Sequence, residues 1–342
     1  MIKLSRDIGI DLGTANVLVY LDGKGIVINE PSAVALDKNT GKVLQVGAAA
    51  KKMLGRTPGN IVAARPLEHG AISDYDMTAT MLSVYLRRIT KMSLVKPRVV
   101  VSVPSGITEV EERAVIQAAM EAGARRVYLI EEPLAAAIGA GMDIKGAGGS
   151  MVIDIGGGTT DIAVLSLNNV VRSTSIDAAG DAFDNAIIQY IRERYQVLVG
   201  NQTAEEIKMA IGCVNPRPEA LVMTVKGRNL STGLPQEVDV TSVDVMHALT
   251  TPCRDILYAV RTILEKTDPE LVADISRSGI TLTGGGSLLY GFDQLIYRST
   301  GIACHVADDA ILCVALGCGK SLKWIDEMQE GTVNYARQKL MQ

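Results

Sequence analysis

Two short stretches of the chain place a carboxylate directly before a glycine turn. Residues 10–14 read IDLGT and carry Asp11, and residues 153–159 read IDIGGGT and carry Asp154. Glycines lack a Cβ, so such a turn can take positive φ and a phosphate can approach its backbone amides closely. A carboxylate beside a phosphate cradle suits a Mg²⁺ ion held mostly through water. The chemistry predicted here is magnesium-phosphate binding, and the simpler alternative is an ordinary glycine-rich hairpin.

The elements that must position these carboxylates form the same pattern twice. Apolar residues 151–153 precede the second turn, and residues 162–165 read as its returning strand. Around the first turn, residues 7–12 and 17–20 form the equivalent pair. Two such hairpins predict a duplicated fold, in which each half supplies one phosphate loop and a nucleotide lies between the halves.

Composition limits the classes of function. A chain of 342 residues with 47% hydrophobic content predicts about two domains. The net charge of −4 comes from 34 basic and 38 acidic residues with no long run of one sign, so we expect no nucleic-acid partner. Five cysteines without a CxxC pair indicate a reducing cytoplasm, and three isolated histidines argue against zinc. We expect neither a signal peptide nor an apolar run of the roughly 18 residues that span a bilayer.

Strands and helices alternate through the first half of the chain, as in an α/β fold. Residues 31–66 read as a small excursion containing a hairpin of 32–37 and 42–46 and a helix over 47–54. Thr108 and Glu111 predict a capping box that opens a helix ending near 122. The other expected strands are 25–31, 98–103 and 127–130, and the other expected helices are 76–92 and 134–141.

The second half repeats this alternation. Thr203 is predicted as the N-cap of a helix that carries two carboxylates in its first turn. Residues 215–240, with prolines and short strands, read as a second excursion. The expected strands are 170–178, 280–283 and 303–306, and the expected helices are 180–195, 242–265, one beginning at 287, and 310–322, which would return to the first half.

In this order the motifs resemble the superfamily of actin, heat-shock chaperones and sugar kinases. Residues 11–14 and 154–160 resemble its two phosphate loops, 284–287 its adenosine loop, and 132–139 and 315–319 its connecting helices. Residues 29–32, 54–58, 103–106 and 123–127 further resemble the bacterial actin-like MreB family, with Val17 in place of a common threonine. The resemblance covers about residues 7–320.

The resemblance implies an α/β, actin-like fold of two duplicated halves with a nucleotide cleft between them. The first half would be residues 1–145 plus 310–342 with a small subdomain at about 32–66. The second would be residues 146–309 with a small subdomain at about 181–243. By the same resemblance the cofactors are ATP and Mg²⁺, with Asp11 and Asp154 orienting the water shell of the metal.

The resemblance also implies roles for individual residues. Glu132 would activate the attacking water and Thr159 would help to position it, although Glu132 could instead only cap the following helix. Glu205 and Lys208 would contact the ribose and base, although their i, i+3 spacing also allows a surface ion pair. The implied nucleotide-binding residues are Gly13, Thr14, Ala15, Asn16, Gly157, Gly158, Thr159, Glu205, Glu206, Ile207, Lys208, Gly285, Gly286, Ser287 and Leu288.

An apolar loop of Met92, Leu94 and Val95 is predicted to touch a membrane. It is flanked by basic residues at 87, 88, 91, 96 and 98, and apolar insertion plus basic attraction to anionic lipid gives weak peripheral binding. Leu94 and Val95 could equally pack under the following strand. The implied location is cytoplasmic, on the inner face of the cell membrane.

The resemblance implies an ATPase that polymerises with copies of itself and organises cell-wall synthesis in an elongated bacterium. Its other partners would be transmembrane proteins of cell elongation and cell-wall synthesis. A chaperone-type nucleotide domain would need a substrate domain after the last connecting helix, where only residues 321–342 remain. A soluble superfamily ATPase or a metabolite kinase that does not polymerise is the main alternative. A plasmid-segregation filament fits the detailed motifs less well.

Overall fold

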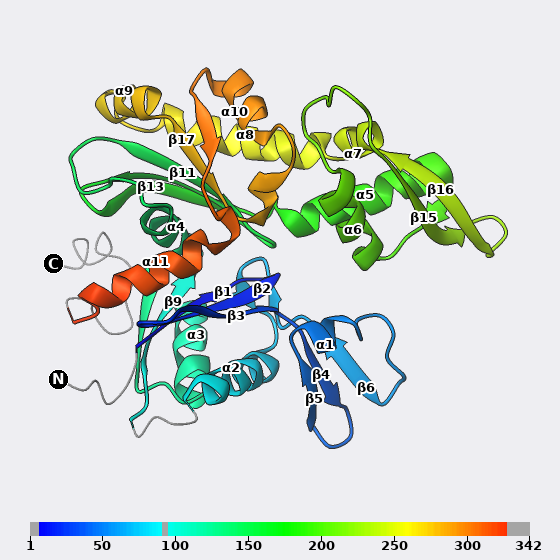
Figure 1. Ribbon diagram of the computed structural model, residues 1–342, viewed down its shortest axis with the longest axis horizontal. Coiled ribbons are helices and arrows are strands. Elements are labelled where there is room, and N and C mark those ends of the chain that lie inside the picture. Colours follow the sequence, from blue (N-terminus) through cyan, green and yellow to red (C-terminus); the bar gives the residue numbers. More distant parts are fainter. Residues whose placement is uncertain (1–6, 91–94, 327–342) are drawn as a thin grey trace. The chain divides into compact units, whose positions relative to one another are not determined.

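The computed structural model describes residues 7–90 and 95–326. The chain divides into two compact units, shown in Figure 1. The first unit consists of residues 1–147, 165–171 and 311–342, and the second consists of residues 148–164 and 172–310. Each unit is built around a five-stranded sheet, so the chain has the expected α/β class.

The sheet of the first unit has the order β10-β9-β1-β2-β3. Strand β1 pairs antiparallel with β2 and parallel with β9, and β9 pairs parallel with β10. Every strand expected in this sheet is confirmed. The bounds are β1 (Ile8–Leu12), β2 (Asn16–Leu21), β3 (Gly25–Pro31), β9 (Arg98–Val103) and β10 (Arg126–Glu131).

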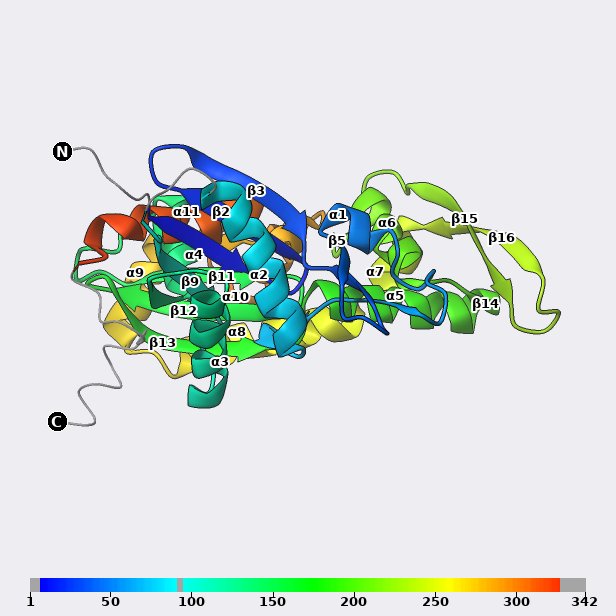
Figure 2. The ribbon, with the colours of Figure 1, turned by 90° about the horizontal axis from the view of Figure 1, so that it is seen from below.

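Alternation along β1 decides where Asp11 points. Ile8, Ile10 and Leu12 belong to the core cluster shared with α2 (Tyr75–Thr90) and α3 (Glu109–Glu121). Successive side chains of a strand point to opposite faces, so Gly9 and Asp11 face away from that cluster. Figures 1 and 2 show α2 and α3 on one side of this sheet, with α11 (Cys313–Ser321) on the other.

Helix α11 packs closely on α4 (Glu132–Ala140), and glycines make the approach possible. A Cβ at Gly139 would overlap the Cys313 carbonyl, and a Cβ at Gly317 would overlap the Ala135 carbonyl. Lys320 Nζ also donates to the carbonyl oxygens of Ile138 at 3.0 Å and Gly139 at 2.8 Å, near the end of α4. These contacts fix α4, and with it the start of that helix at Glu132.

The remaining elements of the first unit follow the expected excursion. Strands β4 (Val34–Asp37), β5 (Val43–Val46) and β6 (Ile61–Ala64) form a small sheet beside the short helix α1 (Ala48–Lys51). Strands β7 (Leu67–Glu68) and β8 (Ala71–Ile72) form a second hairpin. The predicted capping box of Thr108 and Glu111 opens α3.

The sheet of the second unit repeats the first. Its order is β13-β12-β11-β17-β18, which is the order of the first sheet read from the opposite end. Strand β11 pairs parallel with β17, and β17 pairs parallel with β18. The duplication predicted from the two hairpins is therefore confirmed. The bounds are β11 (Ser150–Ile155), β12 (Thr160–Ser166), β13 (Asn169–Ile176), β17 (Ile280–Thr283) and β18 (Cys304–Val306).

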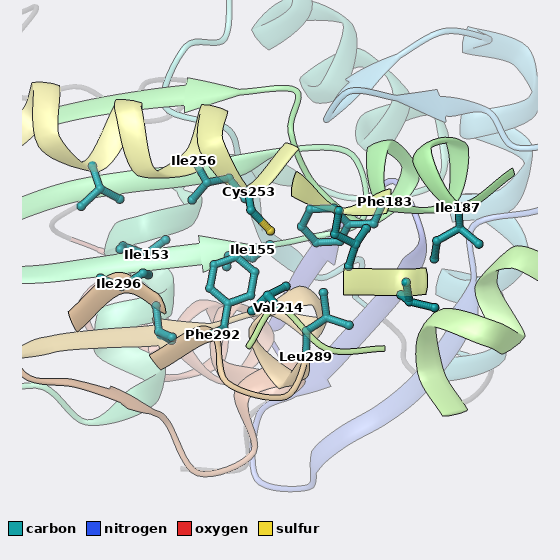
Figure 3. Packing of buried hydrophobic residues seen from close by; sticks show 14 of the residues in the cluster. Ile153, Ile155, Phe183, Ile187, Val214, Cys253, Ile256, Leu289, Phe292 and Ile296 are labelled. Atoms are coloured by element: carbon teal, nitrogen blue, oxygen red, sulfur yellow. The ribbon is translucent and has the colours of Figure 1, made fainter. Parts of the chain in front are cut away.

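The core of the second unit holds β11 in place. Ile153 and Ile155 pack among residues of α5 (Gly180–Tyr195), α8 (Thr250–Glu265) and α10 (Phe292–Thr300), as Figure 3 shows. The rings of Phe183 and Phe292 lie 6.4 Å apart between centroids. Because side chains alternate along the strand, Asp154 points to the face opposite this core.

Several element boundaries differ from those expected. Helix α6 (Asn201–Ile211) begins two residues before Thr203, and its N-cap is Gly200, so the predicted Thr203 cap is wrong. The helical region 242–265 is divided at Leu249 into α7 (Ser242–Ala248) and α8. Residues Gly285–Leu288 form a 3-10 turn, η1, before α10, where an α-helix was expected to begin at 287.

A few elements complete the second unit and the return to the first. Helix α9 (Pro269–Ser278) was not predicted, and strands β14 (Val197–Leu198), β15 (Val222–Asn229) and β16 (Pro235–Thr241) form a small sheet. The turns η2 (Ala310–Leu312) and η3 (Leu322–Trp324) flank α11. Across residues 7–90 and 95–326, no helix combines the length and apolarity needed to cross a bilayer.

Candidate functional site

Asp11 lies buried near the end of β1, with 8% of its surface exposed. Ser102 of the neighbouring strand β9 donates from Oγ to Asp11 Oδ1 at 3.4 Å. On the facing helix α11, the Cys318 thiol donates to the Ile10 carbonyl oxygen at 3.7 Å. The strand and the helix thus enclose the carboxylate from two sides.

The first predicted phosphate loop, residues 13–16, is held by hydrogen bonds from more distant residues of the same unit. Ser32 Oγ donates to the Gly13 carbonyl at 2.5 Å, and the Gly70 amide donates to Thr14 Oγ1 at 2.9 Å. A Cβ at Gly13 would lie 2.8 Å from the Asn16 carbonyl oxygen, so only glycine fits this turn. The loop therefore has a defined backbone conformation before any ligand binds.

Glu132 occupies the first turn of α4 and is 7% exposed. The N-cap of α4 is Glu131, which makes no side-chain capping hydrogen bond and instead accepts one from Ser105 Oγ at 3.1 Å. Pro133 in the first turn suits the start of a helix, because its missing N–H is not needed there. The two adjacent glutamates thus occupy different surroundings.

The buried thiol of Cys318 connects Asp11 with Glu132. Burial raises the pKa of Cys318 well above its ordinary value, and the charges of Asp11 and Glu132 raise it further. Both carboxylates therefore lie near one thiol on α11, within the first unit. The position of the Cys318 thiol beside the two carboxylates was not predicted from the sequence. The sequence identified residues 315–319 only as a connecting helix.

Asp154 is the equivalent carboxylate of the second unit, and it is 5% exposed. Thr283 Oγ1, on the neighbouring strand β17, donates to Asp154 Oδ1 at 2.7 Å. Burial raises the pKa of Asp154 to about 7, the Thr283 hydrogen bond opposes that rise, and the charge of Asp161 adds to it. Asp161 is itself fully buried, and sequence reasoning passed over it although it ends the same glycine-threonine motif.

The second predicted phosphate loop follows β11 and is tied to the start of α5. The Gly156 amide donates to the Thr159 carbonyl at 2.9 Å, while the Gly180 amide donates to the Gly156 carbonyl at 3.1 Å. The Asp181 amide donates to the Gly157 carbonyl at 2.7 Å. Gly156 does not take the positive φ that the sequence suggested, and a Cβ there would lie 3.2 Å from the Thr159 carbonyl oxygen. A close backbone contact is what favours glycine at this position.

Helix α6 carries the residues expected near the adenosine. Lys208 Nζ lies 2.9 Å from Asp184 Oδ1 on α5 and donates to the Gly180 carbonyl at 2.9 Å. Burial raises the pKa of Asp184 to about 6, and the charge of Lys208 opposes that rise. Ile207 is fully buried in the core, whereas Glu205 is half-buried and Glu206 is exposed.

The predicted adenosine loop packs on the end of β11. Gly284 takes φ of +78°, and a Cβ there would overlap the Ile155 carbonyl, so glycine is required on both counts. Ser287 Oγ donates to the Gly284 carbonyl at 2.6 Å, which closes the turn. Leu288 is 56% exposed at its end. The loop therefore lies beside the strand that carries Asp154.

Each unit thus offers one buried carboxylate, a hydroxyl beside it and a glycine loop after it. Carboxylates of this kind fit a Mg²⁺ ion that keeps most of its waters and takes its other oxygens from phosphates. Within residues 7–90 and 95–326 no group of three or more histidine, cysteine or acidic side chains could hold a metal directly. Met92 and Leu94 of the predicted membrane loop lie outside the described residues, and Val95 is half-buried.

A separate groove of about 900 Å³ lies in the second unit, between β13, the start of α5, and α8. Its lining includes Arg172, Asp177, Asn185, Asp255, Tyr258 and Lys266. The candidate nucleotide residues are absent from this lining. The groove therefore belongs to a different surface from the phosphate loops.

Comparison with known sequences gives a consistent result over nearly the whole chain. The family model described as MreB/Mbl protein matches residues 5–330. The cell shape-determining protein Mbl of Bacillus subtilis is 49% identical over 325 residues, which cover 95% of this chain and 98% of that protein. The cell shape-determining protein MreB of Escherichia coli is 50% identical over 328 residues, which cover 94% of each chain.

The comparison with solved structures points to the same family as the comparison with known sequences. MreB5 of Spiroplasma citri bound to ADP is 38% identical and superposes with a TM-score of 0.91, covering 94% of this chain and 98% of that one. The same protein bound to AMPPNP gives a TM-score of 0.90. A MamK double helical filament, at 22% identity and a TM-score of 0.78 over 93% of this chain and 99% of that one, shares the fold.

Proposed function

The chain belongs to the MreB/Mbl family, and from this premise we propose that it binds ATP with Mg²⁺, hydrolyses it, and forms filaments on the inner face of the cell membrane. The observation that carries the proposal is the repeated site: in each sheet a buried carboxylate lies one residue before the end of β1 or β11, and a glycine loop follows the strand. The relative MreB5 binds ADP and AMPPNP, which supports the nucleotide.

The two loops would hold the phosphates. In the first unit these are the backbone and hydroxyl groups of residues 13–16, and in the second those of residues 157–159. Asp11 and Asp154 would orient the metal's water shell. A bound Mg²⁺ supplies positive charge that stabilises the phosphate oxygens, and phosphoryl transfer depends mostly on such positioning and charge. The hydrogen bonds from Ser32 and Gly70 support this role because they preorganise the first loop.

Glu132 would orient and activate the attacking water, with Thr159 helping to position it. A carboxylate acting as a base must lie within hydrogen-bond reach of the proton that it accepts. The neighbouring Glu131 accepts a hydrogen bond from Ser105 on the loop after β9, which gives Glu131 a structural contact. Burial does not separate the two glutamates, since Glu131 is 6% and Glu132 7% exposed. The assignment of Glu132 is supported by its place in the first turn of α4, a helix that glycine contacts hold firmly.

The adenosine would lie near α6 and η1. Glu205, Glu206 and Lys208 offer polar side chains, and Ile207 packs in the core and holds their helix in place. Residues 285–288 offer a short turn that begins with two glycines. The ion pair of Lys208 with Asp184 places the ammonium group at the carbonyl of Gly180, beside the second phosphate loop. We expect Lys208 to contact nucleotide while keeping that partner.

The test of the ATPase compares Glu132→Gln with Glu131→Gln. Wild-type protein should bind ATP tightly in Mg²⁺ and release phosphate without any added acceptor. Glu132→Gln should keep nucleotide binding and lose at least about 100-fold in phosphate release. Glu131→Gln, which retains an oxygen for Ser105, should stay close to wild type. Equal loss in both variants would count against Glu132, and transfer of phosphate to a sugar instead of water would indicate a metabolite kinase.

We further propose that self-association and the membrane part of the function depend on separate surfaces. Sedimentation with and without anionic liposomes tests this in wild type and in a Leu94→Ser/Val95→Ser variant. The variant should polymerise with ATP but lose lipid-dependent pelleting, because it lacks the apolar part of a two-part membrane anchor. Val110→Ser is the matched control, since Val110 is 75% exposed on α3.

The cellular role would be the organisation of cell-wall synthesis through transmembrane partners, which sets an elongated shape. Depletion in the host should then produce rounded cells, and the Glu132→Gln variant should not restore their shape. Wild type that hydrolyses ATP but stays unassembled at every concentration would favour a soluble ATPase over a filament.

A further inference from the structure

Each of the two site carboxylates has a hydroxyl residue beside it on the adjacent parallel strand, as a duplicated fold would explain. In the first sheet the parallel register of β1 and β9 pairs Ile10 with Val101. One step further along, it brings Ser102 beside Asp11. In the second sheet the register of β11 and β17 pairs Asp154 with Thr283. A hydroxyl residue therefore occupies the same position of the next parallel strand in both units.

In the second unit the contact is short and fully buried. Thr283 is 0% exposed, and its Oγ1 donates to Asp154 Oδ1 at 2.7 Å. This distance is typical of a strong hydroxyl-to-carboxylate hydrogen bond. Because the donor sits on a sheet strand, its position is set by the register and not by a flexible loop. One of the two carboxylate oxygens of Asp154 is thus occupied by a rigid donor.

In the first unit the hydroxyl of Ser102 likewise donates to the carboxylate of Asp11, but over a longer distance than in the second unit. Ser102 is 2% exposed, and its Oγ lies 3.4 Å from Asp11 Oδ1. Val99, Val101 and Val103 of β9 belong to the core cluster on one face of the sheet, so Ser102 faces the other side, toward Asp11. A buried hydroxyl without a partner would cost free energy. Ser102 has two polar neighbours for its hydroxyl, the Asp11 carboxylate and the Cys318 thiol, and the carboxylate is the charged one.

We propose that Thr283 and Ser102 are equivalent positioning residues, each fixing one oxygen of the adjacent aspartate so that the other oxygen meets the water shell of the nucleotide's Mg²⁺. Residues that support a metal's ligands in this way set the orientation of those ligands and tune affinity for the metal. This inference rests on the proposed function. It adds to the proposed function two residues that do not contact the nucleotide.

The experiment measures how much Mg²⁺ tightens the binding of a non-hydrolysable ATP analogue. Titrations of fluorescent analogue are made over a range of Mg²⁺ concentrations and in EDTA, for full-length wild type, Thr283→Val, Thr283→Ser and Ser102→Ala. The matched control is Thr281→Val. Thr281 lies two residues earlier on the same strand, is 5% exposed, and contacts His305 at 3.2 Å instead of Asp154.

Thr283→Val should raise the Mg²⁺ concentration at half-saturation about tenfold, with a much smaller change in binding measured in EDTA. Thr283→Ser should restore the wild-type value, because it keeps the hydroxyl. Ser102→Ala should shift the same quantity in the same direction but less, as its longer contact implies. Thr281→Val should bind as wild type does.

Other outcomes separate this inference from the proposed function. An unchanged Mg²⁺ requirement in both Thr283→Val and Ser102→Ala would overturn it while leaving nucleotide binding intact. A merely structural role would lower the melting temperature of Thr283→Val without moving its Mg²⁺ requirement, and that also overturns the inference. If Thr283→Val does not fold, Ser102→Ala decides the question. Wild type that binds no nucleotide would overturn the proposed function itself.

Discussion

Lys208 and Asp184 form an ion pair of 2.9 Å between α6 and α5, and both side chains are largely buried, at 15% and 12% exposure. From the sequence, Lys208 was expected either to contact a nucleotide or to form a surface ion pair with Glu205. The actual partner is 24 positions away in the chain and could not be read from helical spacing. Lys208 therefore supports the start of α5 in the absence of nucleotide.

Replacing Lys208 with methionine should destabilise the nucleotide-free protein. The change leaves the Asp184 carboxylate buried without its counter-charge, which we expect to lower the free energy of unfolding by about 2 to 3 kcal/mol. Adding Asp184→Asn should recover part of that loss. Chemical unfolding followed by circular dichroism measures both.

A surface pair provides the control for that measurement. Lys226 and Glu237 lie 3.0 Å apart but are 76% and 59% exposed. Lys226→Met should therefore change the free energy of unfolding by less than about 1 kcal/mol. Equal effects of the Lys208 and Lys226 changes would show that burial of the Asp184 pair has no energetic consequence.

The contact between α4 and α11 should tolerate no added side chain. Gly139→Ala or Gly317→Ala would place a Cβ into a backbone carbonyl, which cannot move aside as a flexible side chain can. We expect a loss of about 3 kcal/mol or more and a clearly lower melting temperature. Gly59→Ala is the control, because nothing lies within 4 Å of the position its Cβ would take. A melting temperature unchanged in both helix variants would contradict the close packing.

Much of this fold could be predicted from the sequence, because the residue patterns within single strands and helices identify those elements. The strand Ile280–Thr283 was predicted to the residue because alternating apolar residues and threonines between two glycines leave few alternatives. The capping box at Thr108 is equally local. Thr203 was a wrong N-cap because Gly200 precedes it, and a helix can begin at a residue with no capping side chain.

The site was predictable only in part, for a physical reason. Asp11, Asp154 and the glycine loops stand out because their residue types are unusual beside apolar strands. Thr283 and Cys318 were not recognised, since their importance depends on strand register and on helix packing across more than a hundred residues of chain. Nothing in the local sequence specifies which parallel strand lies beside which.

Arg98 provides a further prediction because it is not a free basic residue of the membrane loop. Its Nε and Nη2 donate to the two carboxylate oxygens of Asp7 at 3.1 and 2.7 Å, and Nη1 pairs with Asp326. Arg98→Gln should therefore lower the free energy of unfolding by about 2 kcal/mol, since it breaks a two-point ion pair that is mostly buried.

Arg87 is the comparison, because it is exposed in the last turn of α2. Arg87→Gln should leave stability close to wild type and weaken pelleting with anionic liposomes, an effect that added salt should mimic. If Arg98→Gln is as stable as wild type and loses only lipid binding, the structural role assigned to it is wrong.

The raised pKa of Asp154 predicts how the nucleotide-free protein responds to pH. Burial raises this pKa to about 7, whereas an aspartate in an unfolded chain titrates near about 4. Between these values the folded protein holds a proton that the unfolded chain releases, so stability from this group is present at low pH and lost as pH rises through 7. The loss is at most about 1.4 kcal/mol per pH unit for one proton.

Calorimetric melting from pH 5 to pH 8, in EDTA and without nucleotide, measures this dependence. Asp154→Asn cannot ionise and can still accept the Thr283 hydrogen bond, so its melting temperature should fall less with rising pH than that of wild type. Asp37→Asn is the control, because hydrogen bonds from Thr40 lower the pKa of Asp37 and its titration lies below this range. Parallel pH profiles for wild type and Asp154→Asn would mean that Asp154 is already ionised in the folded protein, and that the Thr283 hydrogen bond outweighs its burial.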